Sequence, residues 1–246
     1  MFIDVHCHLE MLKDLNQLIP DCVSDGTKKI ISSSVDFSSM KQNLIIADKF
    51  PEVECCLGLH PSNILSMNQK QINTAFQFLE KNLSFCKAIG EIGIDFKHAK
   101  TEEQKEKQIK LYQQQLSLAE SNSLPVVIHS RFAEKKSLEI LSEFSVKPLL
   151  HWFDGNKQSF SKAISNNYFF SVGPAVLFNK DYLNKVLEIP LELLMLETDS
   201  PVEFNEIQAK PFWVKKVAEK LAQEKQIPLN KIEEQTTKNA REFFSI

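Results

Sequence analysis

The stretch Phe2-Ile-Asp-Val-His6-Cys-His8, near the start of the chain, decides which fold we predict. A short apolar run of this kind indicates a β-strand over residues 2–6. Successive side chains of a strand point to opposite faces, so His6 and His8 project to the same side, where two imidazoles can chelate one metal ion. A His-x-His pair by itself fits a polar patch equally well, so the rest of the chain must decide.

Seven further apolar runs follow, separated by longer segments with helical periodicity. The predicted strands are 2–6, 29–33, 53–59, 87–91, 125–129, 148–151, 168–172 and 193–197. The main predicted helices are 37–50, 69–82, 102–122, 132–144, 157–166 and 212–225, with a last helix at about 229–244 outside the barrel. Alternation of this kind implies parallel strands joined by crossover helices. Eight strands favour closure, so we predict an α/β fold, a (β/α)8 TIM-type barrel that forms a single domain over 1–246.

The composition narrows the classes of partner. With 29 Lys+Arg against 32 Asp+Glu, the net charge is -3, so the overall field does not attract nucleic acid and a polyanion would need local charge such as bound metal ions. The five cysteines lack the spacing of a zinc ribbon or a disulfide framework and indicate buried thiols in a reducing cytosol. No apolar run reaches transmembrane length, so we expect a cytoplasmic protein without a membrane partner.

Side chains that bind metals stand at or just beyond the carboxyl ends of five predicted strands. They are His6, His8, Glu91, His129, His151 and Asp199. Glu91 or Asp199 alone has a simpler explanation as a helix-capping or solvent-facing carboxylate. In parallel barrels, however, the active site is built at this rim from several strands, so the shared placement predicts a metal-dependent hydrolase.

The ligand set predicts two divalent ions, bridged by Glu91. The first ion would be held by His6, His8, Glu91 and Asp199, and the second by Glu91, His129 and His151. Two ions about 3.5 to 4 Å apart polarise a phosphoryl or carbonyl oxygen and lower the pKa of a shared water towards about 7. Asp199 would also accept the proton of that water, so Asp199 and Glu91 are the predicted catalytic residues. Imidazole and carboxylate ligands together suit Zn, Mn or Fe, and Mg less well.

The motifs around these residues resemble those of the TatD-like metal-dependent deoxyribonucleases of the amidohydrolase superfamily. In chain order they are Asp4-Val-His-Cys-His-Leu9, Gly58-Leu-His-Pro61, Gly90-Glu-Ile-Gly-Ile-Asp95, Gln113-Gln-Gln-Leu116 with Leu124-Pro-Val-Val-Ile-His-Ser-Arg131, His151-Trp-Phe-Asp-Gly155, and Glu197-Thr-Asp-Ser-Pro201. The resemblance implies a barrel, hydrolysis of DNA phosphodiester bonds, and divalent metals on the six residues already named. It also points to His60 and Arg131 as substrate contacts, although His60 fits a strand cap and Arg131 fits a pair with a surface acid.

The sequence departs from the family pattern beyond Asp199. The family usually has an Arg and then an Arg-Asn-x-Pro element there, whereas this chain has Gln208-Ala-Lys-Pro211. A guanidinium that could clamp phosphate is missing, so we expect a DNA substrate that is single-stranded or held near an end. Trp152 alternates away from His151, which favours core packing over the alternative of stacking on a nucleobase.

Two other functions fit the same barrel. One is hydrolysis of an amide, a lactone or an aminoacyl ester, for which many binuclear relatives use a carbamylated lysine where this chain has Glu91. The other is a binding or scaffold protein, which loss of the ligands would indicate. All six candidate ligands are present, so the sequence favours the nuclease and does not assign an oligomeric state.

Overall fold

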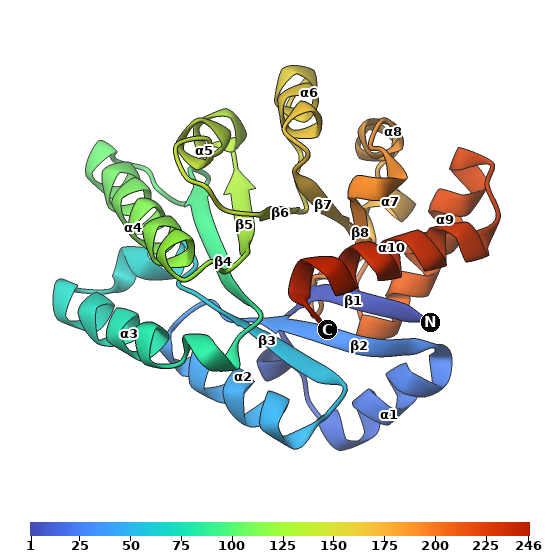
Figure 1. Ribbon diagram of the computed structural model, residues 1–246, viewed down its shortest axis with the longest axis horizontal. Helices are drawn as coiled ribbons and strands as arrows, with labels where there is room; N and C mark the ends of the chain where they lie inside the picture. The colour runs from blue at the N-terminus through green and yellow to red at the C-terminus, as the bar shows by residue number, and fades with distance from the viewer.

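Eight parallel strands form one sheet, in which each strand pairs with the next along the chain (Figure 1). The structure is a computed structural model that describes residues 1–246. The strands are β1 Phe2–Cys7, β2 Thr27–Ser33, β3 Val53–Leu57, β4 Ala88–Asp95, β5 Val126–Arg131, β6 Pro148–His151, β7 Phe169–Val172 and β8 Leu194–Leu196. All eight overlap the predicted strands, and their order confirms the predicted barrel fold.

Residues just beyond β8 join the two ends of the sheet. The backbone N–H of Asp199 donates to the carbonyl of His6 over 2.9 Å, and that of His8 donates to Ser200 over 2.7 Å. Thr198 adds two hydrogen bonds, from its backbone N–H and its hydroxyl, to the carboxylate of Asp4. The barrel is therefore closed by the segment that carries Asp199.

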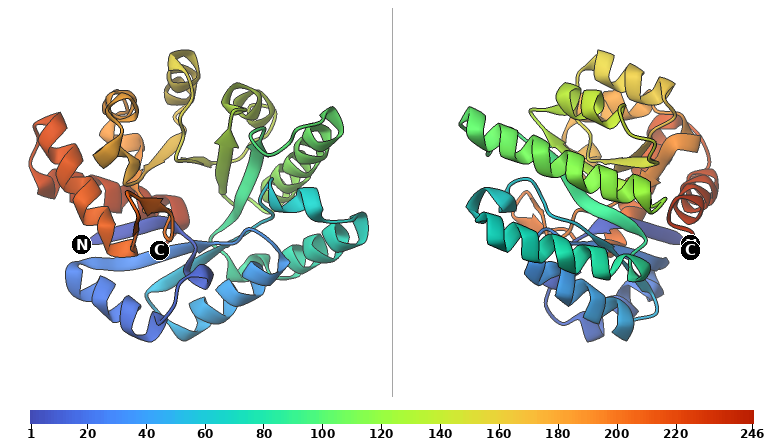
Figure 2. Two further views of the ribbon diagram at one scale, coloured as in Figure 1. Left: turned by 180° about the vertical axis from the view of Figure 1, so that it is seen from behind. Right: turned by 60° about the vertical axis from the view of Figure 1, so that its left-hand side comes forward.

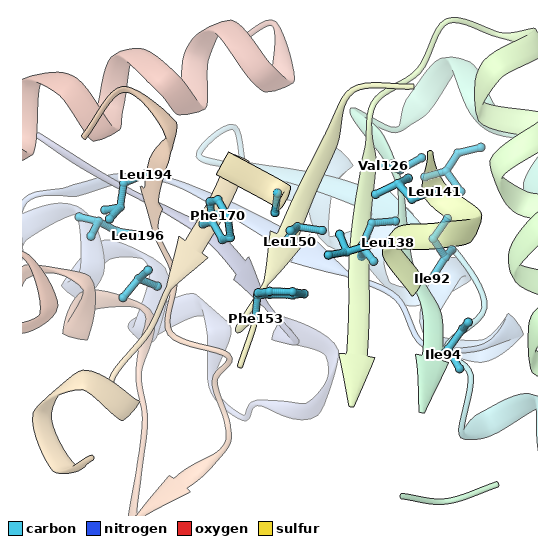
Figure 3. Close-up of a cluster of buried hydrophobic side chains, with 14 of the residues drawn as sticks. Ile92, Ile94, Val126, Leu138, Leu141, Leu150, Phe153, Phe170, Leu194 and Leu196 are labelled. Carbon is cyan, nitrogen blue, oxygen red and sulfur yellow. The ribbon is translucent and has the colours of Figure 1, made fainter. Parts of the chain in front are cut away.

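Ten helices cover the outside of the barrel (Figures 1 and 2). They are α1 Leu15–Asp25, α2 Phe37–Lys49, α3 Gln69–Lys81, α4 Glu102–Ser121, α5 Glu134–Leu141, α6 Lys157–Ser165, α7 Ala175–Phe178, α8 Lys180–Leu187, α9 Val214–Lys225 and α10 Leu229–Phe244. Outward-facing strand residues such as Leu150, Phe170 and Leu194 pack under them in the largest hydrophobic cluster (Figure 3). None of the helices combines the length and the hydrophobicity that a membrane span needs.

The helix predictions differ from the structure in the number of helices and at some helix ends. Helices α1, α7 and α8 were not among the main predicted helices. Helix α5 begins two residues later than predicted, because Phe132 has a left-handed backbone conformation with φ 56°. Helix α10 spans the predicted residues and packs outside the barrel as expected, across its amino end.

That amino end is sealed by aromatic side chains. Phe243 and Phe244 of α10 join a buried cluster with Ile3, Val5, Ile31, Cys56, Ala88, Val127, Leu149 and Met195, which come from β1 to β6 and β8. One layer drawn from so many strands can only fill the barrel interior. Side chains from α10 therefore close this end. Figure 2 (right) shows the α10 ribbon in dark red at one end of the molecule.

Strands β1 and β4 each carry one extra residue relative to the neighbouring strand. From Asp4 to Cys7, β1 advances by three residues while β2 advances by two. From Ile89 to Ile92, β4 advances by three residues while β5 advances by two. Such bulges re-aim side chains and are common next to active sites. Both bulges lie beside candidate ligands, His6 in β1 and Glu91 in β4.

A small hairpin follows β8 at the carboxyl end. Its strands are β9 Glu203–Phe204 and β10 Ile207–Gln208, paired antiparallel. The two loop residues between them, Asn205 and Glu206, both have positive φ, as a tight type I′ turn requires. The hairpin projects from the end of the barrel opposite α10, as the orange segment in Figure 2 shows.

Candidate metal centre

The structure brings the six predicted ligands together around Glu91, which is 2% exposed. Oxygen Oε1 of Glu91 lies 2.8 Å from Nδ1 of His129 and 3.7 Å from Nε2 of both His60 and His151, while Oε2 lies 3.5 Å from Nε2 of His6 and 3.7 Å from Nε2 of His8. Asp199 faces the same space, with Oδ1 3.3 Å from Nε2 of His8 and 3.6 Å from Nε2 of His6. Residues from five strand ends therefore converge on one carboxylate.

The donor set fits divalent metal ions. Three groups have ligand atoms within 4.8 Å of one another: His6 with His151 and Asp199, His6 with His8 and Glu91, and His60 with Glu91 and His129. Nε2 of His6 is buried and has no hydrogen-bond partner. A buried ring nitrogen without a partner is costly unless a ligand uses its lone pair, so this atom supports a cation at Glu91.

The grouping differs in two details from the predicted division of ligands. His151 lies with His6 and Asp199 as well as near Glu91, and His60 lies with Glu91 and His129. His60 was expected to contact substrate, yet its Nε2 faces Glu91 while its Nδ1 bonds the hydroxyl of Ser62 over 2.7 Å. The structure therefore places His60 among the potential ligands.

Several polar groups that the sequence analysis did not single out hold the rings from behind. Glu197, fully buried, accepts from Nδ1 of His151 over 2.8 Å, and Asp95 lies 3.3 Å from Nε2 of His129. Ser33 bonds His6 in β1 and His8 just after it, through its hydroxyl to Nδ1 of His6 and its carbonyl to Nδ1 of His8. Such partners fix the tautomer and the orientation of metal-ligating imidazoles.

A sequence signal for two of these groups was present. Glu197 stands two residues before Asp199, and Asp95 four residues after Glu91, in motifs already quoted. The close approach of β4 and β5 that brings Asp95 to His129 needs Gly93, because a Cβ there would lie 1.9 Å from the His129 carbonyl oxygen. Position alone did not separate a supporting carboxylate from a ligand.

Burial and the neighbouring charges perturb the ring nitrogens strongly. Burial lowers the pKa of His60 to about 3, and the nearby His129 adds to the shift. Burial also opposes the charge of His8 and His151, but the carboxylates outweigh it: Asp199 raises the pKa of His8 to about 9, and Glu197, with other acids, raises the pKa of His151 to about 10. Metal ligation needs neutral imidazole, so binding must displace protons from these two rings.

The other candidate contacts lie around the rim. Arg131 is exposed at the end of β5. Trp152 packs against the core as expected, but it is only half-buried, and its ring also meets Phe204. The strand ends at His151 and Trp152 has φ 37°, so the alternation that predicted a core position stops there.

A parallel barrel with histidines and carboxylates gathered at its carboxyl end defines the class of metal-dependent barrel hydrolases. Comparison with known proteins narrows this class. The family model described as "TatD related DNase" matches residues 3–245. The chain therefore belongs to the TatD-related DNase family.

Individual relatives match along their whole length. The chain is 31% identical to the human protein "Deoxyribonuclease TATDN3", over 98% of this chain and 94% of that protein. It is 28% identical to "Uncharacterized metal-dependent hydrolase YabD" of Bacillus subtilis, with both chains covered completely. The solved structure of YJJV, a TatD homolog from Escherichia coli, superposes with a TM-score of 0.90 at 25% identity and covers 100% of this chain and 98% of that one.

Proposed function

We propose that the protein is a metal-dependent deoxyribonuclease that hydrolyses phosphodiester bonds. The observation that carries the proposal is the convergence of five imidazoles and Asp199 on the buried carboxylate of Glu91, in a chain of the TatD-related DNase family. The name of the human relative supports DNA as the substrate.

Glu91 and Asp199 have different roles in the proposed reaction. We assign Glu91 to bridge two ions, because one of its oxygens faces His129 and the other faces His6. Divalent ions bound there would polarise a phosphoryl oxygen and lower the pKa of water towards about 7. Asp199 is placed to take the proton of the attacking water at Oδ2, because its Oδ1 already faces two histidines while Oδ2 has only His151, at 3.9 Å.

We assign two ions, with Zn, Mn or Fe favoured over Mg by the imidazole donors. The first is assigned to His6, His8, Glu91 and Asp199, and the second to Glu91, His129 and His151, with His60 as a further potential ligand. A second role for His60, and the role of Arg131, is contact with the substrate, since both stand at the rim.

The substrate is proposed to be single-stranded DNA or a DNA end. The net charge of -3 provides no general attraction for a long duplex, so few phosphate contacts remain beyond the metals. We further infer one domain over residues 1–246 and a cytoplasmic location. All eight strands share one sheet, and the five cysteines are free and buried, as suits a reducing compartment.

A substrate screen tests the proposal. Protein reconstituted with Mn²⁺, Zn²⁺ or Mg²⁺ is assayed on single-stranded DNA, duplex DNA, RNA, a simple phosphodiester, an amide, a lactone and an aminoacyl ester, with the Glu91→Gln variant as the control for contaminating nuclease. We expect cleavage of single-stranded DNA and of the phosphodiester, lost in the variant. Turnover of an amide, a lactone or an aminoacyl ester without DNA cleavage would replace the nuclease by the alternative hydrolase.

A further inference from the structure

Three aromatic rings form a continuous row that leads away from the metal centre. Trp152 follows His151 directly, and their ring centroids lie 6.4 Å apart. The Trp152 ring lies 5.7 Å from that of Phe204, tilted by 30°, and Phe204 lies 5.5 Å from Phe178, with the planes only 13° apart. These rings come from three successive strand–helix connections, after β6, β7 and β8.

The three rings of the row are partly exposed to solvent, unlike the side chains of a packed core. Phe178 is 49% exposed, and Trp152 and Phe204 are half-buried. The nearly parallel rings of Phe204 and Phe178, with centroids 5.5 Å apart, are displaced sideways as in offset stacking, and the Trp152 ring is tilted against Phe204. Each ring therefore leaves part of its face or edge open to another flat partner.

The inner end of the row is anchored to the metal centre by one carboxylate. Glu197 accepts the backbone N–H of Trp152 through Oε1 over 3.1 Å and the ring of His151 through Oε2 over 2.8 Å. Phe204 stands in the short β9–β10 hairpin, whose tight turn limits its movement. Glu197 therefore holds both the potential metal ligand His151 and Trp152, the first ring of the row.

At this site, aromatic stacking can bind a nucleic acid better than the overall charge of the protein can. The chain carries a net charge of -3, so a nucleic acid gains little from the overall field. Base stacking on aromatic side chains contributes about 1 to 3 kcal/mol per base and works for every base, because each has a π face. A row of rings next to a phosphodiester-cleaving centre can therefore hold a strand that the surface charge does not.

We propose that Trp152, Phe204 and Phe178 form a nucleobase-binding surface for the single strand whose phosphate lies in the metal centre. This inference rests on the proposed function and adds the subsite to it. The steps of 6.4, 5.7 and 5.5 Å place Phe178 within about five stacked nucleotides of His151, at 3.4 Å per nucleotide. The subsite acts on oligonucleotides and leaves a minimal phosphodiester unaffected.

The test measures binding separately from cleavage. Metal-loaded wild type, Phe178→Ala and Phe178→Tyr are titrated with a phosphorothioate octathymidylate, which resists hydrolysis, and with the same strand made abasic. We expect Phe178→Ala to raise Kd about 5- to 100-fold for the base-bearing strand and Phe178→Tyr to retain most of the affinity. The abasic strand should bind both variants and the wild type alike, and hydrolysis of an aliphatic phosphodiester, which has no ring to stack, should not change.

Phe85→Ala is the matched control, because Phe85 is also an exposed phenylalanine, at 66%, but it precedes β4 at the amino end of the barrel. Unchanged octathymidylate binding by Phe178→Ala, or an equal loss with the abasic strand, overturns the nucleobase subsite even if DNA is cleaved. Loss of DNA and phosphodiester cleavage from all proteins, with Phe178-dependent binding retained, instead overturns the proposed function and keeps the subsite.

Discussion

The two ends of the barrel are built from the same eight strands and have opposite chemistry. At the amino end, Phe243 and Phe244 pack onto an apolar layer of the interior. At the carboxyl end, the interior positions are occupied by histidines and by Glu91 and Asp199, and Nε2 of His6 has no hydrogen-bond partner. The side chains at the amino end are stabilised by apolar packing alone, whereas the carboxyl end holds buried polar groups that need a ligand.

This contrast separates the residues that stabilise the fold from the residues that carry out the chemistry. Apolar packing at the amino end holds the strands in place. At the carboxyl end, the buried charges lower the stability of the fold until a cation is bound. Substitutions at the two ends should therefore change different observables: catalysis and metal affinity at one end, and the free energy of unfolding at the other.

The largest effect is expected for Asp199→Asn at the carboxyl end. The amide cannot accept a proton, so kcat should fall by about 10²- to 10⁴-fold or more, while the thermal midpoint stays close to that of the wild type. Steady-state kinetics on a phosphodiester, with a melting curve as the control for folding, measure both. A variant that keeps half of the wild-type rate would remove Asp199 from the reaction centre.

Phe243→Ala should act only on the opposite end. Phe243 is 2% exposed and packs against Phe169 and Phe244, so its truncation should cost about 3 to 5 kcal/mol in the free energy of unfolding. Urea denaturation gives this number, and metal content and kcat of the folded protein should be unchanged. A fall in metal affinity comparable to that of a ligand variant would mean that the two ends are coupled.

Glu197→Gln tests the support behind one ligand. The glutamine keeps the shape but loses the charge that holds the Nδ1 proton of His151, so metal affinity should fall about 10- to 100-fold. Titration with a competing chelator measures it. Asp154→Asn, three residues beyond His151 on the exposed surface, is the control and should bind metal as the wild type does.

The metal affinity of the wild type should rise with pH. In the metal-free protein the pKa of His8 is raised to about 9 and that of His151 to about 10, so both rings are protonated at pH 7, and each loses its proton when it ligates. We expect about a tenfold gain in affinity per pH unit for each proton displaced, up to about pH 9. Calorimetry in buffers of different ionisation enthalpy counts the protons released, and a count of zero at pH 7 contradicts the assignment.

Cys7→Ala should have the smallest effect. Cys7 lies between two ligands, yet its side chain packs outward with Leu9 and Cys22. We expect a loss of about 1 kcal/mol in stability and full metal occupancy. Elemental analysis and urea denaturation measure both, and a loss of metal would contradict the outward orientation.

Much of this arrangement could be predicted from the sequence. Hydrophobic periodicity located all eight strands, and parallel barrels place functional groups at the carboxyl ends, so the convergence of His129 and His151 on Glu91 followed from position alone. Helices α1 and α7 were harder to predict, because α1 contains Pro20 in its interior and α7 has only four residues. The role of His60 was also open, since a residue at the rim can face either a ligand or the solvent.

The sequence by itself determined which residues stand at the strand ends, because the alternation of apolar and polar side chains is a local property of the chain. Only the tertiary structure decided how they are aimed. The extra residues in β1 and β4 re-aim His6 and Glu91, and the pairing of Glu197 with His151 joins positions 46 residues apart. Such contacts depend on the register between strands, which is set by the packing of the whole barrel and not by any single segment.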